Sequence, residues 1–147
     1  MPQLLLGILA IFNENATKYI PNRQNLILVH YQNLQETLER YKLNPTILVS
    51  CIASRSGGVK DSWNAEYDAN MELLQIARKF KFMRFILLSA ICVQKPHLEF
   101  QKAKLAFENE LQKSSIPYDV IRPTAFFKSL SGQVGRVQKG KRFIVFD

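Results

Sequence analysis

The strongest constraint on the fold of this chain is a stretch in which two apolar strands flank one amphipathic helix, over residues 86–127. Residues 86–93 predict a strand that runs into a polar turn, and residues 118–122 predict the next strand. The segment between them has the apolar spacing of a helix and carries Lys104 on its buried side. This order is typical of an open parallel sheet, which binds nucleotides beyond the carboxyl ends of its strands.

The rest of the chain shows the same alternation, which predicts parallel pairing and an α/β fold with a Rossmann-type open parallel sheet and flanking helices. The run at 46–53 is apolar throughout and predicts a strand buried on both faces of the sheet. The further elements expected upstream are a strand at 25–30, a helix at 32–42, a loop at 54–61 and a helix from 61 or 62 to about 81.

The segment after Pro123 is expected to contain two turns and a last strand. Residues 125–130 predict a short apolar turn that leads to Ser131 and Gly132. Residues 138–141 predict a hairpin turn into a strand at 142–146.

Each predicted helix carries an apolar face, and these faces define the expected core. Asp61 or Ser62 is expected to cap the second helix. The core positions are Leu34, Leu38 and Tyr41 on the first helix; Tyr67, Met71, Leu74 and Phe80 on the second; and Phe100, Ala103, Phe107 and Leu111 on the third.

The composition predicts one ordinary globular domain. The chain has 147 residues, of which 47% are hydrophobic and 22% charged, with a formal net charge of +8. The basic residues concentrate at 78–84, at the end of a predicted helix, where cations complement the helix dipole. No nucleic-acid-binding motif accompanies this charge, so we expect no nucleic-acid partner. Cys51 and Cys92 lack metal-ligand spacing, so we expect no metal site and predict that both are small buried side chains.

An apolar run at 4–12 leaves several interpretations open. Nine residues are too few for a membrane span, which needs roughly 20. No lysine or arginine precedes the run and no cleavage site follows it, so a secretory signal is not indicated. The run is a core strand, a core helix or a sequence foreign to the fold.

Three segments are expected to meet at one edge of the sheet: residues 50–55, 89–91 and 122–126. Small residues at these strand ends allow the backbone to approach a flat cofactor closely. Phe100 and Lys104 are four residues apart, hence on one helical face. The ammonium of Lys104 carries three N–H groups, which suit the hydroxyls of a ribose.

These residues resemble the extended and atypical short-chain dehydrogenase/reductases, in the branch that includes NmrA-like proteins. That superfamily carries Tyr-x-x-x-Lys on the helix, and this chain has Phe100-x-x-x-Lys104. Within the branch, residues 50–63, 88–96 and 122–130 look like the vinyl reductases of chlorophyll synthesis. The resemblance extends from about Leu48 to the C-terminus and fades upstream.

The resemblance implies an NADPH-dependent oxidoreductase that reduces the 8-vinyl group of a divinyl chlorophyllide or protochlorophyllide to ethyl. The tetrapyrrole pigment is then the substrate and Lys104 the catalytic residue, which positions the nicotinamide ribose and adds positive field. Phe100 has no proton to donate, so the donor is water, substrate or another side chain. The residues implied in cofactor binding are Cys51, Ala53, Ser54, Ser89, Ala90, Ile91, Lys104, Pro123, Thr124 and Phe126.

The chain departs from the family pattern at its N-terminal side. The family begins with a glycine-rich turn that seats the pyrophosphate at a helix N-terminus. Here Gly7 stands alone and the next glycine is Gly57. We therefore expect residues 1–147 to form a single but N-terminally incomplete NAD(P)-binding domain, a fragment in which 1–25 are unmatched to the family. The expected location is the plastid for an algal or plant source and the cytoplasm for a bacterial one; the oligomeric state is open.

Two other functions are compatible with the same residues: an NmrA-like regulator that binds a dinucleotide without turnover, and a degenerate domain without enzymatic activity. Individual residues also have simpler interpretations. Lys104 is four residues before Glu108 and can pair with it on the helix surface. Ser89 can satisfy a strand-end backbone group, and residues 126–127 can be core rather than the lining of a pigment pocket.

Overall fold

A computed structural model of the chain describes residues 7–11, 26–43, 46–124 and 127–142. From Leu26 onward, strands and helices alternate in it as predicted. In chain order they are β1 (Gly7–Ile11), β2 (Leu26–His30), a 3-10 turn (Tyr31–Asn33), α1 (Leu34–Arg40), β3 (Ile47–Ser50), α2 (Val59–Ser62), a π-helical turn (Trp63–Asp68), α3 (Ala69–Lys79), β4 (Arg84–Leu88), α4 (Glu99–Gln112), β5 (Tyr118–Ile121) and α5 (Phe127–Gln138).

Every strand pair in the described residues is parallel, which confirms the predicted α/β class. β1 pairs with β2, with Gly7 opposite Leu26. β3, β4 and β5 form a three-stranded sheet in that order, in which Ile47 lies opposite Arg84. The two connections within this sheet run through α2–α3 and through α4, as in a βαβ unit.

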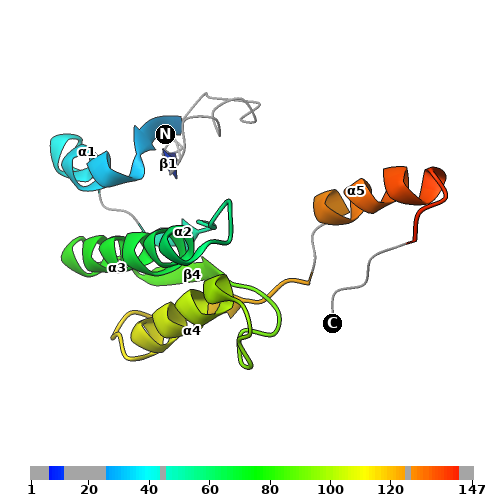
Figure 1. The fold of residues 1–147 in the computed structure, drawn as a ribbon. Coiled ribbons are helices and arrows are strands. Elements are labelled where there is room, and N and C mark those ends of the chain that lie inside the picture. The colour runs from blue at the N-terminus through cyan, green and yellow to red at the C-terminus, as the bar shows by residue number, and fades with distance from the viewer. Residues whose placement is uncertain (1–6, 12–25, 44–45, 125–126, 143–147) are drawn as a thin grey trace.

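Helices α3 and α4 lie side by side over one face of this sheet and enclose the main core (Figure 1). Phe85 and Leu87 of β4 are fully buried under them. Phe107 of α4 packs against Phe85, with ring centroids 5.8 Å apart. The predicted helical faces are confirmed in outline, although Tyr41 is exposed just after α1. The core cluster also contains Leu34, Leu38, Leu48, Leu73, Leu74, Ile76, Ala77, Phe82, Leu111 and Ile116.

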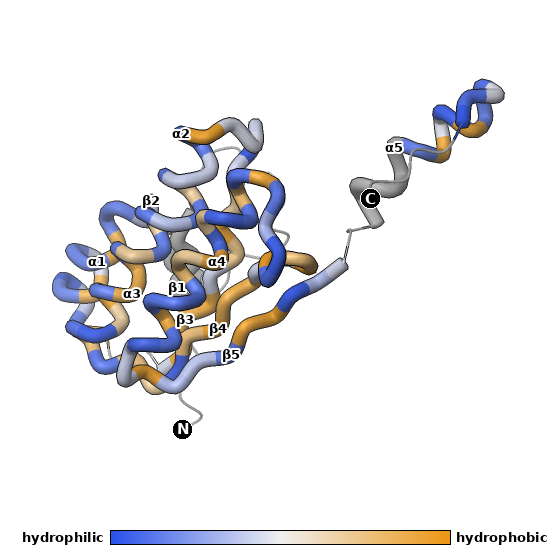
Figure 2. Tube along the Cα trace, turned by 60° about the horizontal axis from the view of Figure 1, so that its bottom comes forward, coloured by the Kyte–Doolittle hydropathy of each residue, from blue (hydrophilic) through white to orange (hydrophobic). Residues whose placement is uncertain are grey.

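The opposite face of β3 is open, so the prediction of a strand buried on both faces is wrong. Leu48 and Ser50 point into the core, whereas Ile47 and Val49 are 55% and 59% exposed. Figure 2 shows apolar residues along all three strands of this sheet. The continuous apolar run therefore places apolar side chains on both faces of β3, but α3 and α4 cover only one of these faces.

The segment after Pro123 forms a helix, which corrects two predictions. α5 occupies Phe127–Gln138, where a turn at 125–130 and the start of a hairpin at 138–141 were expected. Gly132 and Gly135 lie within it; a glycine in a helix costs only about 1 kcal/mol relative to alanine, which weakens a helix without forbidding it. α5 lies apart from the other helices (Figure 1). Residues 143–146 of the expected strand lie outside the described residues.

Both cysteines are exposed, and their predicted burial is wrong. β3 ends at Ser50 and β4 at Leu88, so each cysteine lies beyond its strand. Cys92 adopts a positive φ of 65° in the turn after β4.

The N-terminal apolar run contains a strand, β1, at Gly7–Ile11. Its remaining residues lie outside the described part of the chain. None of the helices in the described residues is long and apolar enough to cross a membrane.

Replacing Phe107 with alanine is expected to lower the free energy of unfolding by about 3–5 kcal/mol, because it leaves a cavity beneath the sheet. Urea unfolding followed by far-ultraviolet circular dichroism measures this loss. Met83 is 67% exposed, and Met83→Ala is the matched control, expected within ~0.5 kcal/mol of the parent. Equal losses for the two variants would contradict the assigned core.

Candidate functional site

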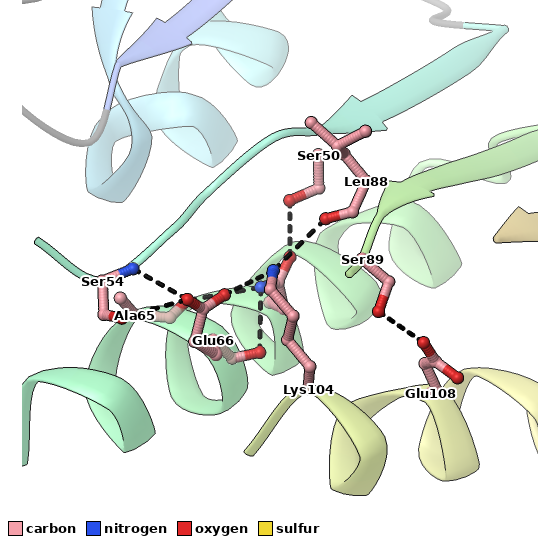
Figure 3. Close-up of polar contacts among 9 residues, drawn as sticks. Ser50, Ser54, Ala65, Glu66, Leu88, Ser89, Lys104 and Glu108 are labelled. Carbon is pink, nitrogen blue, oxygen red and sulfur yellow. Dashed lines mark hydrogen bonds and ion pairs between the residues drawn. The ribbon is translucent and has the colours of Figure 1, made fainter. Parts of the chain in front are cut away.

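The side chain of Lys104 is buried at the carboxyl ends of β3 and β4. It is 5% exposed, although lysine is almost never fully buried without a partner. α4 presents it toward the sheet on the same helical face as Ala103 and Phe107. Its Nζ lies 3.3 Å from the backbone oxygen of Leu88, the last residue of β4. Figure 3 shows this side chain reaching from α4 toward the strand ends.

Glu66 supplies the opposite charge. Its Oε2 lies 2.6 Å from Lys104 Nζ, and the carboxylate is 2% exposed. This contact is an ion pair without the angular geometry of a hydrogen bond, since Oε2 has no hydrogen-bond partner among the described residues. The other oxygen, Oε1, accepts hydrogen bonds from the backbone N–H and the hydroxyl of Ser54, at 2.8 and 3.1 Å. Glu66 thus joins α4 to the loop that follows β3.

A π-helical turn at Trp63–Asp68 carries Glu66 between α2 and α3. Such turns are rare and occur mostly as single turns within α-helices. The side-chain amide of Asn70 donates to the backbone oxygens of Ala65 and Glu66, at 3.3 and 3.0 Å. Its Oδ1 accepts a hydrogen bond of 2.5 Å from the hydroxyl of Ser50, at the end of β3. Asn70 therefore fixes the π-helical turn against the sheet.

A second buried carboxylate holds the ends of β4 and β5. Glu108 lies one turn after Lys104 on α4 and is 6% exposed. It accepts a hydrogen bond from the hydroxyl of Ser89 and pairs with the guanidinium of Arg122, which follows β5. The hydrogen bond with Glu108 raises the pKa of Arg122. The expected alternative pairing of Lys104 with Glu108 is therefore wrong: each takes a partner from another element.

The loop after β3 is organised by Asp61. Its Oδ2 accepts hydrogen bonds from the backbone N–H groups of Arg55 and Ser56, at 2.9 and 2.7 Å, and from the Ser56 hydroxyl. These hydrogen bonds hold the pKa of Asp61 below its ordinary value, and the bonds from the backbone and hydroxyl of Ser56 have the largest effect. The predicted helix cap is displaced, because the helix begins at Val59 with Gly58 as its N-cap.

The three predicted strand ends lie next to one another. Beyond the strands, Ser89 donates its backbone N–H to Ile121 and Ile91 donates to Pro123, at 2.8 and 3.0 Å. The ammonium of Lys104 lies beside the end of β4 and pairs with Glu66, which holds the loop after β3. Of the predicted cofactor-binding residues, Cys51, Ala53, Ile91 and Thr124 are exposed, Ser54, Ala90 and Pro123 are half-buried, Ser89 and Lys104 are buried, and Phe126 lies outside the described residues.

Ser89 is engaged by Glu108 through its side chain rather than serving a strand-end backbone group. Glu66 and Asn70 were not predicted from the sequence. A signal for them exists, because they stand four residues apart and continue the buried stripe of Leu74 and Ala77 toward the helix start. A carboxylate and an amide on an apolar face require buried partners.

An open parallel sheet with a charged cluster at its carboxyl edge defines a Rossmann-type domain. Solved structures share this fold. The NAD+ complex of the Bordetella bronchiseptica enzyme WbmH matches with a TM-score of 0.70 and 17% identity, over 92% of this chain and 54% of that one. A putative NAD-dependent epimerase/dehydratase from Bacillus halodurans matches with a TM-score of 0.63 and 19% identity, over 80% and 57%.

Sequence comparison finds similar chloroplastic enzymes. The chain is 51% identical over 119 residues to the chloroplastic divinyl chlorophyllide a 8-vinyl-reductase of Arabidopsis thaliana, covering 77% of this chain and 28% of that protein. It is 55% identical over 103 residues to the enzyme of the same name from Zea mays, covering 67% and 26%. No family profile matches. The chain is therefore similar to plant divinyl chlorophyllide a 8-vinyl-reductases over most of its own length, and it spans little more than a quarter of theirs.

The loop after β3 is expected to open in acid. The folded pKa of Asp61 lies below its ordinary value of 3.8, so its stabilisation of the loop is present above that pH and is lost as the pH falls through the folded value. Backbone amide resonances of Arg55 and Ser56 should titrate together with a midpoint below 3.8. Asp61→Asn should abolish this titration; a midpoint at or above the ordinary value would contradict the assignment.

Proposed function

We propose that this chain contributes to the NADPH-dependent reduction of the 8-vinyl group of divinyl chlorophyllide or protochlorophyllide to ethyl. The observation that carries the proposal is the 51% identity with the named reductase of Arabidopsis thaliana. The pigment is the proposed substrate and NADPH the proposed cofactor. The chloroplastic location of the named relatives supports a plastid location for this chain as well.

The nicotinamide half of the cofactor fits the chemistry at the strand ends. Ala53 and Thr124 are small and exposed, and Ala90 is half-buried, so backbone at all three ends is open to a flat ring. Glu66 and Leu88 engage the ammonium of Lys104 in the described residues. An ammonium has three N–H groups and only the one to Leu88 is in a hydrogen bond among the described residues, so a donor remains for a ribose hydroxyl. The sequence has no glycine between Gly7 and Gly57, so residues for the pyrophosphate half are not assigned.

Reduction of a vinyl group suits a helix that carries phenylalanine in place of tyrosine. NADPH would supply the hydride to the terminal vinyl carbon. The electron pair of the vinyl π bond would spread over the conjugated macrocycle and then take a proton from water, the substrate or another side chain. A hydroxyl that protonates an alkoxide is therefore not required at Phe100. We assign Lys104 to orient the ribose and thereby the nicotinamide face. The strand-end residues provide the surface against which the ring rests.

Lys104→Met is expected to weaken NADPH binding by at least about tenfold, because it removes the ribose donor. Fluorescence titration of NADPH with the purified chain measures this affinity. Lys102 lies on the same helix, is half exposed and pairs with Glu99, so Lys102→Met is the matched control and should bind as the parent does. Unchanged affinity in Lys104→Met would reject the assigned role.

Turnover is tested separately from binding. The purified chain with NADPH and divinyl chlorophyllide is expected to shift the Soret absorbance of the pigment, and Lys104→Met should abolish the shift. Binding of NADPH without a shift would favour the dinucleotide-binding regulator, and neither binding nor a shift would favour a domain without enzymatic function.

A further inference from the structure

We infer that Glu66 is a positioning residue that holds the ammonium of Lys104 at the ends of β3 and β4. This inference rests on the proposed function for its purpose, since it assigns to Glu66 the control of the lysine that is proposed to orient the nicotinamide ribose. The geometric part of the inference is independent of that function, because it follows from the ion pair and from the hydrogen bonds to Ser54.

The first argument is burial. Side chains of Lys104 and Glu66 are 6% and 2% exposed, and each charge alone would be strongly disfavoured in such surroundings. A charged Lys104 can therefore be buried at these strand ends only because the carboxylate of Glu66 lies beside it. The next acidic side chain on α4, Glu108, does not serve, because Arg122 and Ser89 engage it.

The second argument is the shape of the helix. In the described chain, the π-helical turn coincides with the segment that carries Glu66, and π-turns occur frequently at functional sites. Asn70 satisfies the backbone oxygens of Ala65 and Glu66 within this turn. An irregular turn and the buried amide of Asn70 together hold the Glu66 carboxylate in contact with Lys104.

The third argument is what the carboxylate joins. One oxygen contacts Lys104 and the other holds the backbone and hydroxyl of Ser54, in the loop that follows β3. A buried ion pair is weak evidence for stability by itself, because well-packed apolar side chains often replace it without loss. The geometry instead couples two predicted ligand-binding groups, the lysine ammonium and the strand-end loop, through one side chain (Figure 3).

Accessibility of Lys104 tests the positioning directly. In the parent chain its amine should react slowly with an acylating reagent, as followed by mass spectrometry. Glu66→Gln should raise that rate at least about fivefold, because a buried ammonium without its anion is driven toward water. Glu66→Asp, shorter by one methylene, should give an intermediate rate. Glu110 pairs with Lys113 at the surface, and Glu110→Gln is the control, with no change expected at Lys104. An unchanged rate in Glu66→Gln, at a temperature where that variant is folded, would overturn the inference.

NADPH affinity separates positioning from general damage. If Glu66 acts through Lys104, Glu66→Gln should weaken binding in the parent but should have no further effect in the Lys104→Met background. Losses that add in the double variant would show that Glu66 acts otherwise and would overturn the inference. If the parent chain does not bind NADPH, the proposed function fails, and the acylation rates alone still decide whether Glu66 positions Lys104.

Discussion

The ion pair between Glu66 and Lys104 is the interaction on which the carboxyl edge of this sheet depends. Taking two charges out of water costs several kcal/mol for each ion, and their attraction offsets this cost only when the geometry and the surrounding hydrogen bonds are good. Glu66 meets that condition with Ser54 on its second oxygen, and Lys104 with the backbone of Leu88. The pair therefore couples α4, the π-helical turn, the loop after β3 and the end of β4.

α4 extends this coupling to the third strand. Lys104 and Glu108 are one turn apart and would form a modest surface pair on an isolated helix, worth about 0.2–0.5 kcal/mol. Instead each is buried and bonded to a different element, so that one helix reaches the ends of β3, β4 and β5. Surface pairs elsewhere, such as Lys79 with Glu39, are half exposed and contribute little to stability. Buried partners, rather than the number of ion pairs, connect the strand ends at this edge.

The elements that periodicity can specify were predicted well. β4, α4 and β5 follow the apolar pattern of their segments, and the burial of Lys104 follows from its place on the face of Ala103 and Phe107. The ion-pair partner of Lys104 could not be predicted from the sequence. Spacing along one helix favours Glu108, whereas Glu66 is 38 positions away in sequence. The π-helical turn has no periodic signature. β3 was misjudged because an apolar run does not show how many layers cover it. α5 was missed because its short apolar segment, followed by Ser131 and Gly132, was interpreted as a turn.

The partnership with Glu66 also changes what Lys104 can contribute. A lone ammonium beside the nicotinamide would add positive field, as first expected from the sequence. Paired with a carboxylate at 2.6 Å, it forms a nearly neutral unit whose field at a distance is that of a dipole. What remains undiminished is the directional N–H donor, held by Glu66 on one side and by the Leu88 carbonyl on another. The proposed role of Lys104 is therefore orientation of the ribose, and the net charge of +8 is distributed elsewhere on the molecule.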